Sequence, residues 1–541
     1  MKYVGITIGP IFKTIGEAIS PAGLWFGSYF FSTVTKKLCE KLVKIPKVKI
    51  FSPFYDSNSN QNPQEDGIGR YHDRILFLVD DNTVIEGELP SIISAVKKEM
   101  AEKFGKFKTD KEIMHFVDNY LRIDFVILNK KTINEIIGKS EKAGNNIAII
   151  LNDALDALEL MAAGKGRTDM NLFASFFAGK KGNRNIYIKE SKLFTDTKPN
   201  SQLVIKHPDD SSDLKSIEDI ALSRKKEEDS SEEIPDGKIA PKRSEYYAVV
   251  NSDGDKVGTL LKALCKDLEI SKQSERINIF SRACLDYAGE AAKLVGKYGG
   301  MTIYAGGDDL LFIAPVHSLL SLCSELDEMF KKTLKKGLEE VDLPDDSINV
   351  SLSFGVAVQY VKYPLYEALE RARVQLYKAK ESCGNRLGIE LVKHSGKTVQ
   401  LMIENEKLDV IDHLINYRAT TNDQALESVL YNLQDTEIIF KLLFEKTAQN
   451  VFDFQEYKIR FLNNFNNPNQ LAYHDYLEKI AEFFYDNYLK EYQDMVDMKE
   501  KVDGICTKRK MSIGEYYTKE LQAILFLVKF WQCDWRRNQQ H

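Results

Sequence analysis

Two short apolar runs, at residues 301–305 and 310–314, are joined by the tetrapeptide Gly306-Gly307-Asp308-Asp309. Because glycine adopts positive φ values without strain, this pattern predicts a β-hairpin with two adjacent carboxylates at its tip. Adjacent carboxylates repel each other unless a cation lies between them, and hard oxygen ligands of this kind suit Mg²⁺ or Mn²⁺. For the tetrapeptide alone, a solvated Asp-Gly turn is the alternative.

A second acidic segment lies upstream. Asp253-Gly254-Asp255 falls in a predicted loop, residues 251–256, which follows a predicted strand at 246–250. A carboxylate at the end of one strand, beside a carboxylate hairpin on a neighbouring strand, is the layout that two-metal nucleotidyl transfer requires. One ion lowers the pKa of the attacking hydroxyl and the other neutralises a triphosphate. We therefore expect Asp253, Asp308 and Asp309 to be catalytic metal ligands.

The elements around these segments predict a β-α-β-β-α-β order. Apolar residues between 277 and 294 recur at helical spacing and stop before Gly299-Gly300. Downstream lie a predicted helix, strand and helix, at residues 319–334, 350–359 and 364–380. This order is that of a ferredoxin-like palm, in which the end of the first strand and the central hairpin meet at one edge of the sheet.

The first 130 residues predict a second unit of the same kind. The predicted elements are a strand at 3–8, a helix at 21–42, a strand at 74–79, a helix at 90–104 and a strand at 125–129. At the end of its first strand, Gly9-Pro10 stand where the other unit has Asp253. This unit therefore lacks metal carboxylates and is expected to be non-catalytic. Trp25 is expected in its core.

Several motifs, in this order along the chain, resemble the large polymerase subunit of type III CRISPR effector complexes. They are Asp253-Gly254-Asp255, Gly306-Gly307-Asp308-Asp309, Ser351-Leu352-Ser353-Phe354-Gly355, Ala379-Lys380 and Asn385. The amino terminus, with Ile8-Gly9-Pro10-Ile11 and the segment 24–29, is similar to the III-B (Cmr) branch. The resemblance covers residues 1 to about 130 and 244–395.

The resemblance implies an α+β fold with two ferredoxin-like, adenylyl/guanylyl cyclase-like palm domains. The expected domains are a non-catalytic palm at 1–130, a helical insertion with a charged linker at 131–243, a catalytic palm at 244–395 and an all-α domain at 396–541. Many relatives begin with an HD nuclease domain. The sequence starts directly at the first palm, and His72-Asp73 and His474-Asp475 lack the further ligands of an HD site, so an HD-less form is expected.

The resemblance also implies an ATP-dependent, pyrophosphate-releasing nucleotidyltransferase in an RNA-guided antiviral complex. Its partners would be the other Cmr-type subunits, a guide RNA and a target RNA. Gly254, Gly306 and Gly307 would allow the nucleotide to approach the backbone, and Lys380 would neutralise the triphosphate, although an exposed helix-end lysine is the alternative. The product would be an adenylate second messenger. Most family members make cyclic oligoadenylates, and some HD-less III-B relatives instead join AMP to S-adenosylmethionine.

Asp73 bears on the choice between these products. Family members commonly have Pro-Asn-Arg or Pro-Asn-Lys before the strand at 74–79, where this chain has Tyr71-His72-Asp73-Arg74. An aspartate there would disfavour a triphosphate as second substrate and favour a cation such as S-adenosylmethionine, by roughly 1 to 4 kcal/mol at 4 Å. The alternative is that Asp73 pairs with Arg70 or Arg74 on the surface.

Composition limits the remaining function classes. The net charge of −6 provides no basic footprint for binding nucleic acid unaided, so RNA contacts are expected to be local or supplied by partners. Seven scattered cysteines without a Cys-x-x-Cys pair indicate neither a disulfide framework nor zinc, which favours a cytoplasmic setting. No apolar run approaches the about 18 residues of a membrane span. Gly164-Lys165-Gly166-Arg167 lacks the spacing of a phosphate-binding loop and is expected to be an exposed turn.

Two other function classes remain open. A diguanylate-cyclase-like enzyme also carries a Gly-Gly-Asp hairpin on a palm, but this chain has Asp309-Leu310 where that pattern has Glu-Phe. A non-catalytic scaffold is the second alternative, and the intact Asp253, Asp308 and Asp309 argue against it.

Overall fold

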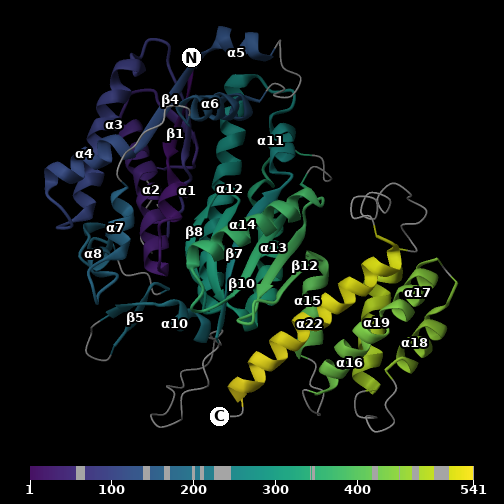
Figure 1. Ribbon diagram of the computed structural model, residues 1–541. Coiled ribbons are helices and arrows are strands. Elements are labelled where there is room, and N and C mark those ends of the chain that lie inside the picture. Colours follow the sequence, from purple (N-terminus) through teal and green to yellow (C-terminus); the bar gives the residue numbers. More distant parts are fainter. Residues whose placement is uncertain are drawn as a thin grey trace. The chain divides into compact units, whose positions relative to one another are not determined.

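The structure is a computed structural model that divides into two compact units. The first comprises Met1–Ser231 and Glu245–Gly388, and the second Glu232–Ser244 and Ile389–His541. The structure describes residues 1–541 except 57–66, 138–145, 164–170, 198–201, 208–211, 224–244, 342, 344–347, 417–423, 450, 466–473, 491, 493–510 and 540–541. The predicted turn at 164–167 and most of the charged linker lie outside the described residues. Figure 1 labels the elements of each unit.

The amino-terminal part of the first unit contains a four-stranded antiparallel sheet. Its strands are β1 (Lys2–Gly9), β2 (Lys49–Ser52), β3 (Arg74–Val79) and β4 (Arg122–Asn129), in the order β2-β3-β1-β4. The helices α2 (Pro21–Leu42), α3 (Ile85–Ala101) and α4 (Asp110–Tyr120) connect them. This is the strand order of a ferredoxin-like unit, so the predicted palm-like fold of this segment is confirmed.

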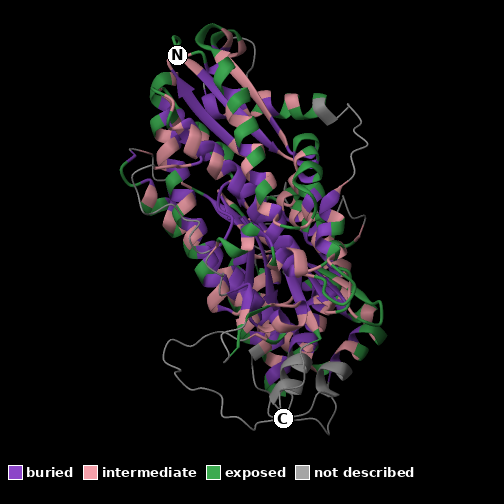
Figure 2. Ribbon diagram, turned by 90° about the vertical axis from the view of Figure 1, so that its left-hand side faces the viewer, coloured by how far each residue is buried: buried purple, intermediate pink, exposed green. Residues whose placement is uncertain are grey.

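The same strand order recurs after residue 245. There β7 (Tyr246–Asp255), β8 (Met301–Gly306), β9 (Asp309–Pro315) and β10 (Ser351–Tyr360) lie in the order β10-β7-β9-β8. The connecting helices are α11 (Val257–Cys265), α12 (Ile270–Lys297) and α13 (Leu319–Gly337), and α14 (Leu365–Glu381) follows the last strand. The predicted repeat of two palms is therefore present. Buried residues, purple in Figure 2, run along the strands of both sheets.

Local sequence explains how the first palm forms its core. The Ser20 hydroxyl caps α2 by accepting the Gly23 N–H at 3.1 Å, and Pro21 begins the helix, where its missing N–H costs nothing. Trp25 is buried and its indole N–H donates to the Gly67 carbonyl at 2.6 Å, so it is a core residue as expected. Phe26 packs on Phe176 of α7 (Leu172–Ala178), which joins the segment after residue 131 to this core.

Helix α6 (Ile147–Ala163) packs against β1 and β4 of the first sheet. A Cβ atom at Gly5 would lie 3.0 Å from the Leu155 side chain, so the helix approaches the strand closely where β1 has no side chain. The opposite face of β1 buries Val4, Ile6 and Ile8 in the core with α2. The first sheet is thus covered on both faces.

The described part of the second unit is mainly helical, as predicted. Its helices are α15 (Leu408–Asn416), α16 (Gln424–Asp435), α17 (Glu437–Ala448), α18 (Phe454–Asn463), α19 (His474–Phe484) and α22 (Ile513–Gln539). The exception is strand β12 (Thr398–Glu404), which pairs with β11 (Arg386–Val392), so the segment after 396 is not entirely α-helical. Trp531 is buried, whereas the side chains of Trp535, Arg536 and Arg537 lie outside the described residues. No described helix is both long and apolar enough to cross a membrane.

Some predicted boundaries were wrong for identifiable reasons. Strand β7 continues through the predicted loop to Asp255, because its last residue still pairs with Ser351 of β10. Helix α3 begins at Ile85 and contains Pro90 within it, so this proline does not mark the start of the helix. Strand β2 and helix α4 were not predicted.

Candidate functional site

The hairpin between β8 and β9 holds Asp308 and Asp309, as predicted. Gly306 pairs with Asp309 at its closed end, which leaves Gly307 and Asp308 as the turn. Gly307 has φ of +68°, a value that favours glycine, and a Cβ there would meet no atom within 4 Å. Gly306 is small for another reason: a Cβ there would lie 2.3 Å from the Tyr304 hydroxyl. The open side of the hairpin is therefore at Gly307.

Strand β7 brings Asp253 to the same edge. Ser252 pairs with Leu310 of β9, so Asp253 is the next residue along β7 at the hairpin. The neighbouring Gly254 approaches the hairpin so closely that a Cβ would lie 2.7 Å from Asp308 Oδ2. The Gly254 N–H also hydrogen-bonds the Asp308 carboxylate. Glycine at 254 is thus required for the first strand and the hairpin to meet.

Lys380, in the last turn of α14, reaches this edge from the other side. Its ammonium donates to the Gly254 carbonyl at 3.1 Å and forms an ion pair with Asp253. Burial lowers the pKa of Lys380 to about 8. The lysine therefore lies among the predicted metal ligands and is not a solvated helix-end residue.

Asp255 has a different role from Asp253. Its buried carboxylate accepts hydrogen bonds from the hydroxyls of Ser351 at 3.0 Å and Ser353 at 2.9 Å, and from the Asn385 N–H at 2.7 Å. Gly384, with φ of +74°, lies directly against it. Asp255 thus ties β7 to β10 and to the turn after α14, and these contacts occupy its oxygens. This role of Asp255 was not predicted from the sequence. The pattern that could have indicated it is the alternation of Ser351 and Ser353 along β10.

The surroundings of the two hairpin carboxylates disfavour their charged forms. Burial raises the pKa of Asp308. The surrounding protein and the charges of Asp308 and Asp73 raise the pKa of Asp309, although this residue is exposed to solvent at the hairpin tip. The structure does not bring the three predicted ligands fully together. Among the described residues, the group with all ligand atoms within 4.8 Å of one another is His474, Asp475 and Glu478 on α19. Asp253 faces Lys380 and would have to turn to share an ion with the hairpin.

A cavity of about 250 Å³ adjoins the hairpin. Its lining includes Asp308 and Asp309 of the hairpin. It also includes Arg70, His72 and Asp73 of the first palm. The first palm reaches this place because Gly69 forms a bridge with Tyr304 on β8 and accepts the Ala305 N–H at 3.0 Å. The structure therefore places the predicted second-substrate residue in one cavity with the hairpin.

Comparisons with known proteins agree with this architecture. The family model described as Cas10/Cmr2, second palm domain, matches residues 246–388, and the model described as CRISPR-associated protein Cmr2, N-terminal, matches residues 3–108. The chain thus resembles Cas10/Cmr2 proteins over these two regions. It is 32% identical over 171 residues to the CRISPR system Cmr subunit Cmr2 of Pyrococcus furiosus, an alignment covering 28% of this chain and 19% of that relative. The chain thus matches about a fifth of that relative's length.

Two solved structures resemble this chain in fold. The first is the Csm1-Csm4 cassette in complex with pppApA, with a TM-score of 0.50 and 11% identity over 97% of this chain and 69% of that one. The second is the type III-B Cmr-beta complex in the apo state, with a TM-score of 0.50 and 12% identity over 87% of this chain and 77% of that one. At these identities the likeness shows the fold alone.

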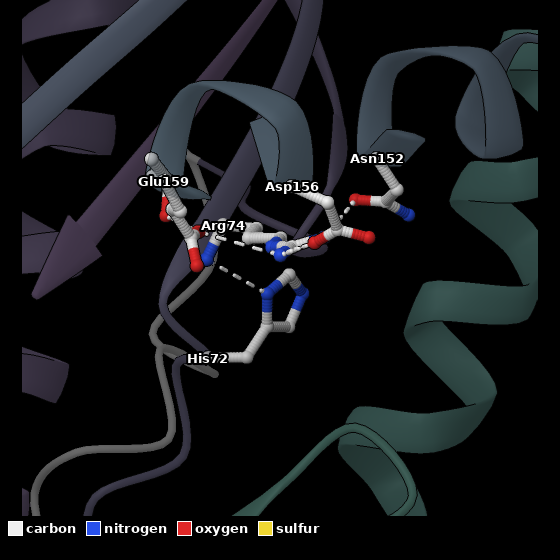
Figure 3. A network of polar contacts seen from close by, with 6 residues as sticks. His72, Arg74, Asn152, Asp156 and Glu159 are labelled. Atoms are coloured by element: carbon white, nitrogen blue, oxygen red, sulfur yellow. Dashed lines mark hydrogen bonds and ion pairs between the residues drawn. The ribbon is translucent and has the colours of Figure 1, made fainter. Parts of the chain in front are cut away.

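The surroundings of Asp73 bear on its charge. Asp73 is half-buried, and among the residues that the structure describes it forms no ion pair. Arg74 instead pairs with Asp156 and Glu159 of α6 (Figure 3). Asp73 thus forms no direct ion pair with Arg74, but burial raises the pKa of Asp73 and the nearby Arg74 charge opposes that rise.

Several cavity residues were not predicted from the sequence. The Ser52 hydroxyl lies 3.2 Å from His72 Nε2, and both side chains line the cavity. Burial lowers the pKa of His72 to about 4, so the ring is neutral near neutral pH. On the other palm, Ser281 accepts the Phe54 N–H at 2.7 Å. No local pattern marks these residues, because only the packing of one palm on the other brings them together.

Proposed function

We propose that this chain is the ATP-dependent nucleotidyltransferase of an RNA-guided type III-B complex and makes an adenylate second messenger for antiviral defence. The observation that carries the proposal is the convergence of Asp253, Asp308, Asp309 and Lys380 at one sheet edge, beside a cavity shared by both palms. Its partners would be the other Cmr-type subunits, a guide RNA and a target RNA. The family models and the Cmr complex among the similar folds support this assignment.

The residues at this edge suit two Mg²⁺ or Mn²⁺ ions. Three carboxylates provide hard oxygen donors. Among the contacts described above, one cation, Lys380, forms an ion pair with one of them, Asp253. Asp253, Asp308 and Asp309 would hold the ions, which supply charge neutralisation and lower the pKa of an attacking hydroxyl. Binding would require Asp253 to exchange its contact with Lys380 for an ion.

The chain's own groups would then position ATP for transfer. Lys380, released from Asp253, would pair with the triphosphate, and the open side of Gly307 would admit the nucleotide to the hairpin backbone. The Gly254 N–H keeps Asp308 oriented. A 3′-hydroxyl oxygen forms a bond to the α-phosphorus of ATP, the bond from that phosphorus to the bridging oxygen breaks, and pyrophosphate leaves. The hydroxyl proton passes to solvent.

Asp73 points to a cationic second substrate. Its carboxylate shares the cavity with the hairpin and lacks a described ion pair, so it would attract the α-ammonium or sulfonium group of S-adenosylmethionine. The product would then be AMP joined to S-adenosylmethionine. The second candidate is a cyclic oligoadenylate, and Arg70 favours it, since this cation lines the same cavity and would attract a triphosphate.

Mass spectrometry of products from the assembled complex, activated by target RNA, tests this choice. With ATP and S-adenosylmethionine together, we expect the conjugate as the main product. Asp73→Asn should shift the ratio of conjugate to oligoadenylate by about tenfold toward the oligoadenylate, because the removed charge is worth roughly 1 to 4 kcal/mol at 4 Å. Oligoadenylates unchanged by S-adenosylmethionine, or an Asp73→Asn variant with the wild-type ratio, would contradict the proposal.

A further inference from the structure

Arg74, the first residue of β3, is held by one face of α6. Its guanidinium donates to Asn152 Oδ1 at 3.2 Å, to Asp156, and to Glu159 Oε1 at 3.3 Å (Figure 3). These acceptors are spaced four and three residues apart, so they lie along one side of the helix. Thr7 of β1 adds a hydrogen bond to the same Glu159 oxygen at 2.5 Å. The network therefore fixes both the guanidinium and one of its carboxylates.

The network contains more negative than positive charge. Two carboxylates surround one guanidinium, and both are more exposed than it is, at 58% and 46% against 23% for Arg74. Arg74 and Asn152 also line the cavity that contains Asp73. An arginine next to Asp73 in sequence is the obvious counter-ion for it, yet its hydrogen bonds go to α6. Helix α6 thus takes the hydrogen bonds of the Arg74 guanidinium, while Asp73 feels the Arg74 charge without a direct ion pair.

Among the described cavity residues, Arg70 is a second cation, but none of the hydrogen bonds described for the Arg74 network involves it. His72, whose Nδ1 accepts the Arg74 N–H at 3.3 Å, carries no charge near neutral pH because its ring is buried. Asp73 stays close enough to the hairpin to raise the pKa of Asp309. The charge that Asp73 adds to the cavity therefore depends on where the Arg74 guanidinium lies.

We propose that Asp156 and Glu159 are positioning residues for second-substrate specificity: they hold the Arg74 guanidinium in hydrogen bonds to α6 in place of a direct ion pair with Asp73, so that this part of the cavity accepts a cationic molecule in place of a triphosphate. The inference rests on the proposed function and deepens it. It assigns a role in substrate choice to the helical segment after the first palm, which itself carries none of the predicted site residues.

The test neutralises both carboxylates, Asp156→Asn with Glu159→Gln, in the full chain assembled with its partner subunits and RNAs. Freed from α6, Arg74 can pair with Asp73. We expect the KM for S-adenosylmethionine to rise about tenfold and the product ratio to move about tenfold toward oligoadenylates, with little change in total AMP transfer at saturating substrate. The matched control is Glu86→Gln with Asp196→Asn, which removes two carboxylates from surface ion pairs with Lys2 and Lys103. It should leave the ratio unchanged.

A third substitution separates positioning from general structural support. Adding Arg74→Gln to the double variant removes the freed cation and should return the KM for S-adenosylmethionine to within about twofold of the wild type. A purely structural network would give no such rescue. If the double variant does not fold, Arg74→Gln alone decides: we expect conjugate formation at least as favoured as in the wild type, and a tenfold loss would overturn the inference.

The outcomes also separate this inference from the proposed function. A wild-type complex that makes only oligoadenylates overturns the cationic second substrate and the inference together. A wild-type complex that makes the conjugate, with a ratio unaffected by Asp156→Asn and Glu159→Gln, overturns the inference alone.

Discussion

Replacing Asp308 and Asp309 by asparagine is expected to lower AMP transfer from ATP by about 1,000-fold or more. Asparagine keeps the shape of each side chain but removes the charge that would hold the ions, and loss of even one preorganised electrostatic group costs about 10² to 10³ in rate. The hairpin should stay folded, because its register depends on the β8–β9 pairing and on Gly307. The rate of pyrophosphate release by the activated complex measures the effect.

The matched control is Asp286→Asn, an exposed carboxylate on α12 of the same palm. It should leave the rate within about twofold of the wild type. Size-exclusion chromatography with bound guide RNA checks that both variants assemble. Wild-type turnover by the Asp308→Asn, Asp309→Asn variant would refute the assignment of the hairpin as the reacting centre.

Asp255→Ala is expected to destabilise the protein and not simply to slow the reaction. The substitution leaves the hydroxyls of Ser351 and Ser353 and the N–H of Asn385 without their buried acceptor. Each unsatisfied buried donor costs about 1 to 3 kcal/mol, so a loss of roughly 3 kcal/mol or more follows. In a thermal melt of the full chain, the first transition should fall by about 5 °C or more.

The control for this prediction is Asp286→Ala, which removes an exposed carboxylate without buried partners and should shift the melt by less than about 1 °C. Asp255→Ala with an unchanged melt would show that the carboxylate does not tie β7 to β10. The buried hydrogen bonds of Asp255 would then contribute little to the stability of the protein.

The sequence predicted those features that local patterns determine. The hairpin was predicted because a Gly-Gly-Asp-Asp turn lies between two apolar runs, and α2 because Ser20 and Pro21 mark its start. The repeat of two palms followed from the order of such elements. The position of Asp73 beside the hairpin was predicted only through the resemblance to a family, since nothing local to residues 71–74 indicates it.

Features that depend on long-range packing could not be predicted in the same way. Strand β7 extends to Asp255 because β10 continues to pair with it, although Gly254 and two aspartates favour a loop locally. The contact of Lys380 with Gly254 and Asp253 depends on where α14 ends, at least 126 residues further along the chain. The cavity and the Arg74 network arise where the first palm meets the second palm and α6, so they became visible only in three dimensions.

The central claim is that ATP is the donor in a nucleotidyl transfer carried out at the edge formed by β7 and the β8–β9 hairpin. The most direct measurement is pyrophosphate release by the assembled complex, given Mg²⁺ with ATP or GTP, with and without target RNA. We predict release from ATP that requires target RNA and Mg²⁺ and disappears in the Asp308→Asn, Asp309→Asn variant. Release from GTP but not ATP, or equal release from ATP by the wild type and that variant, would contradict the account.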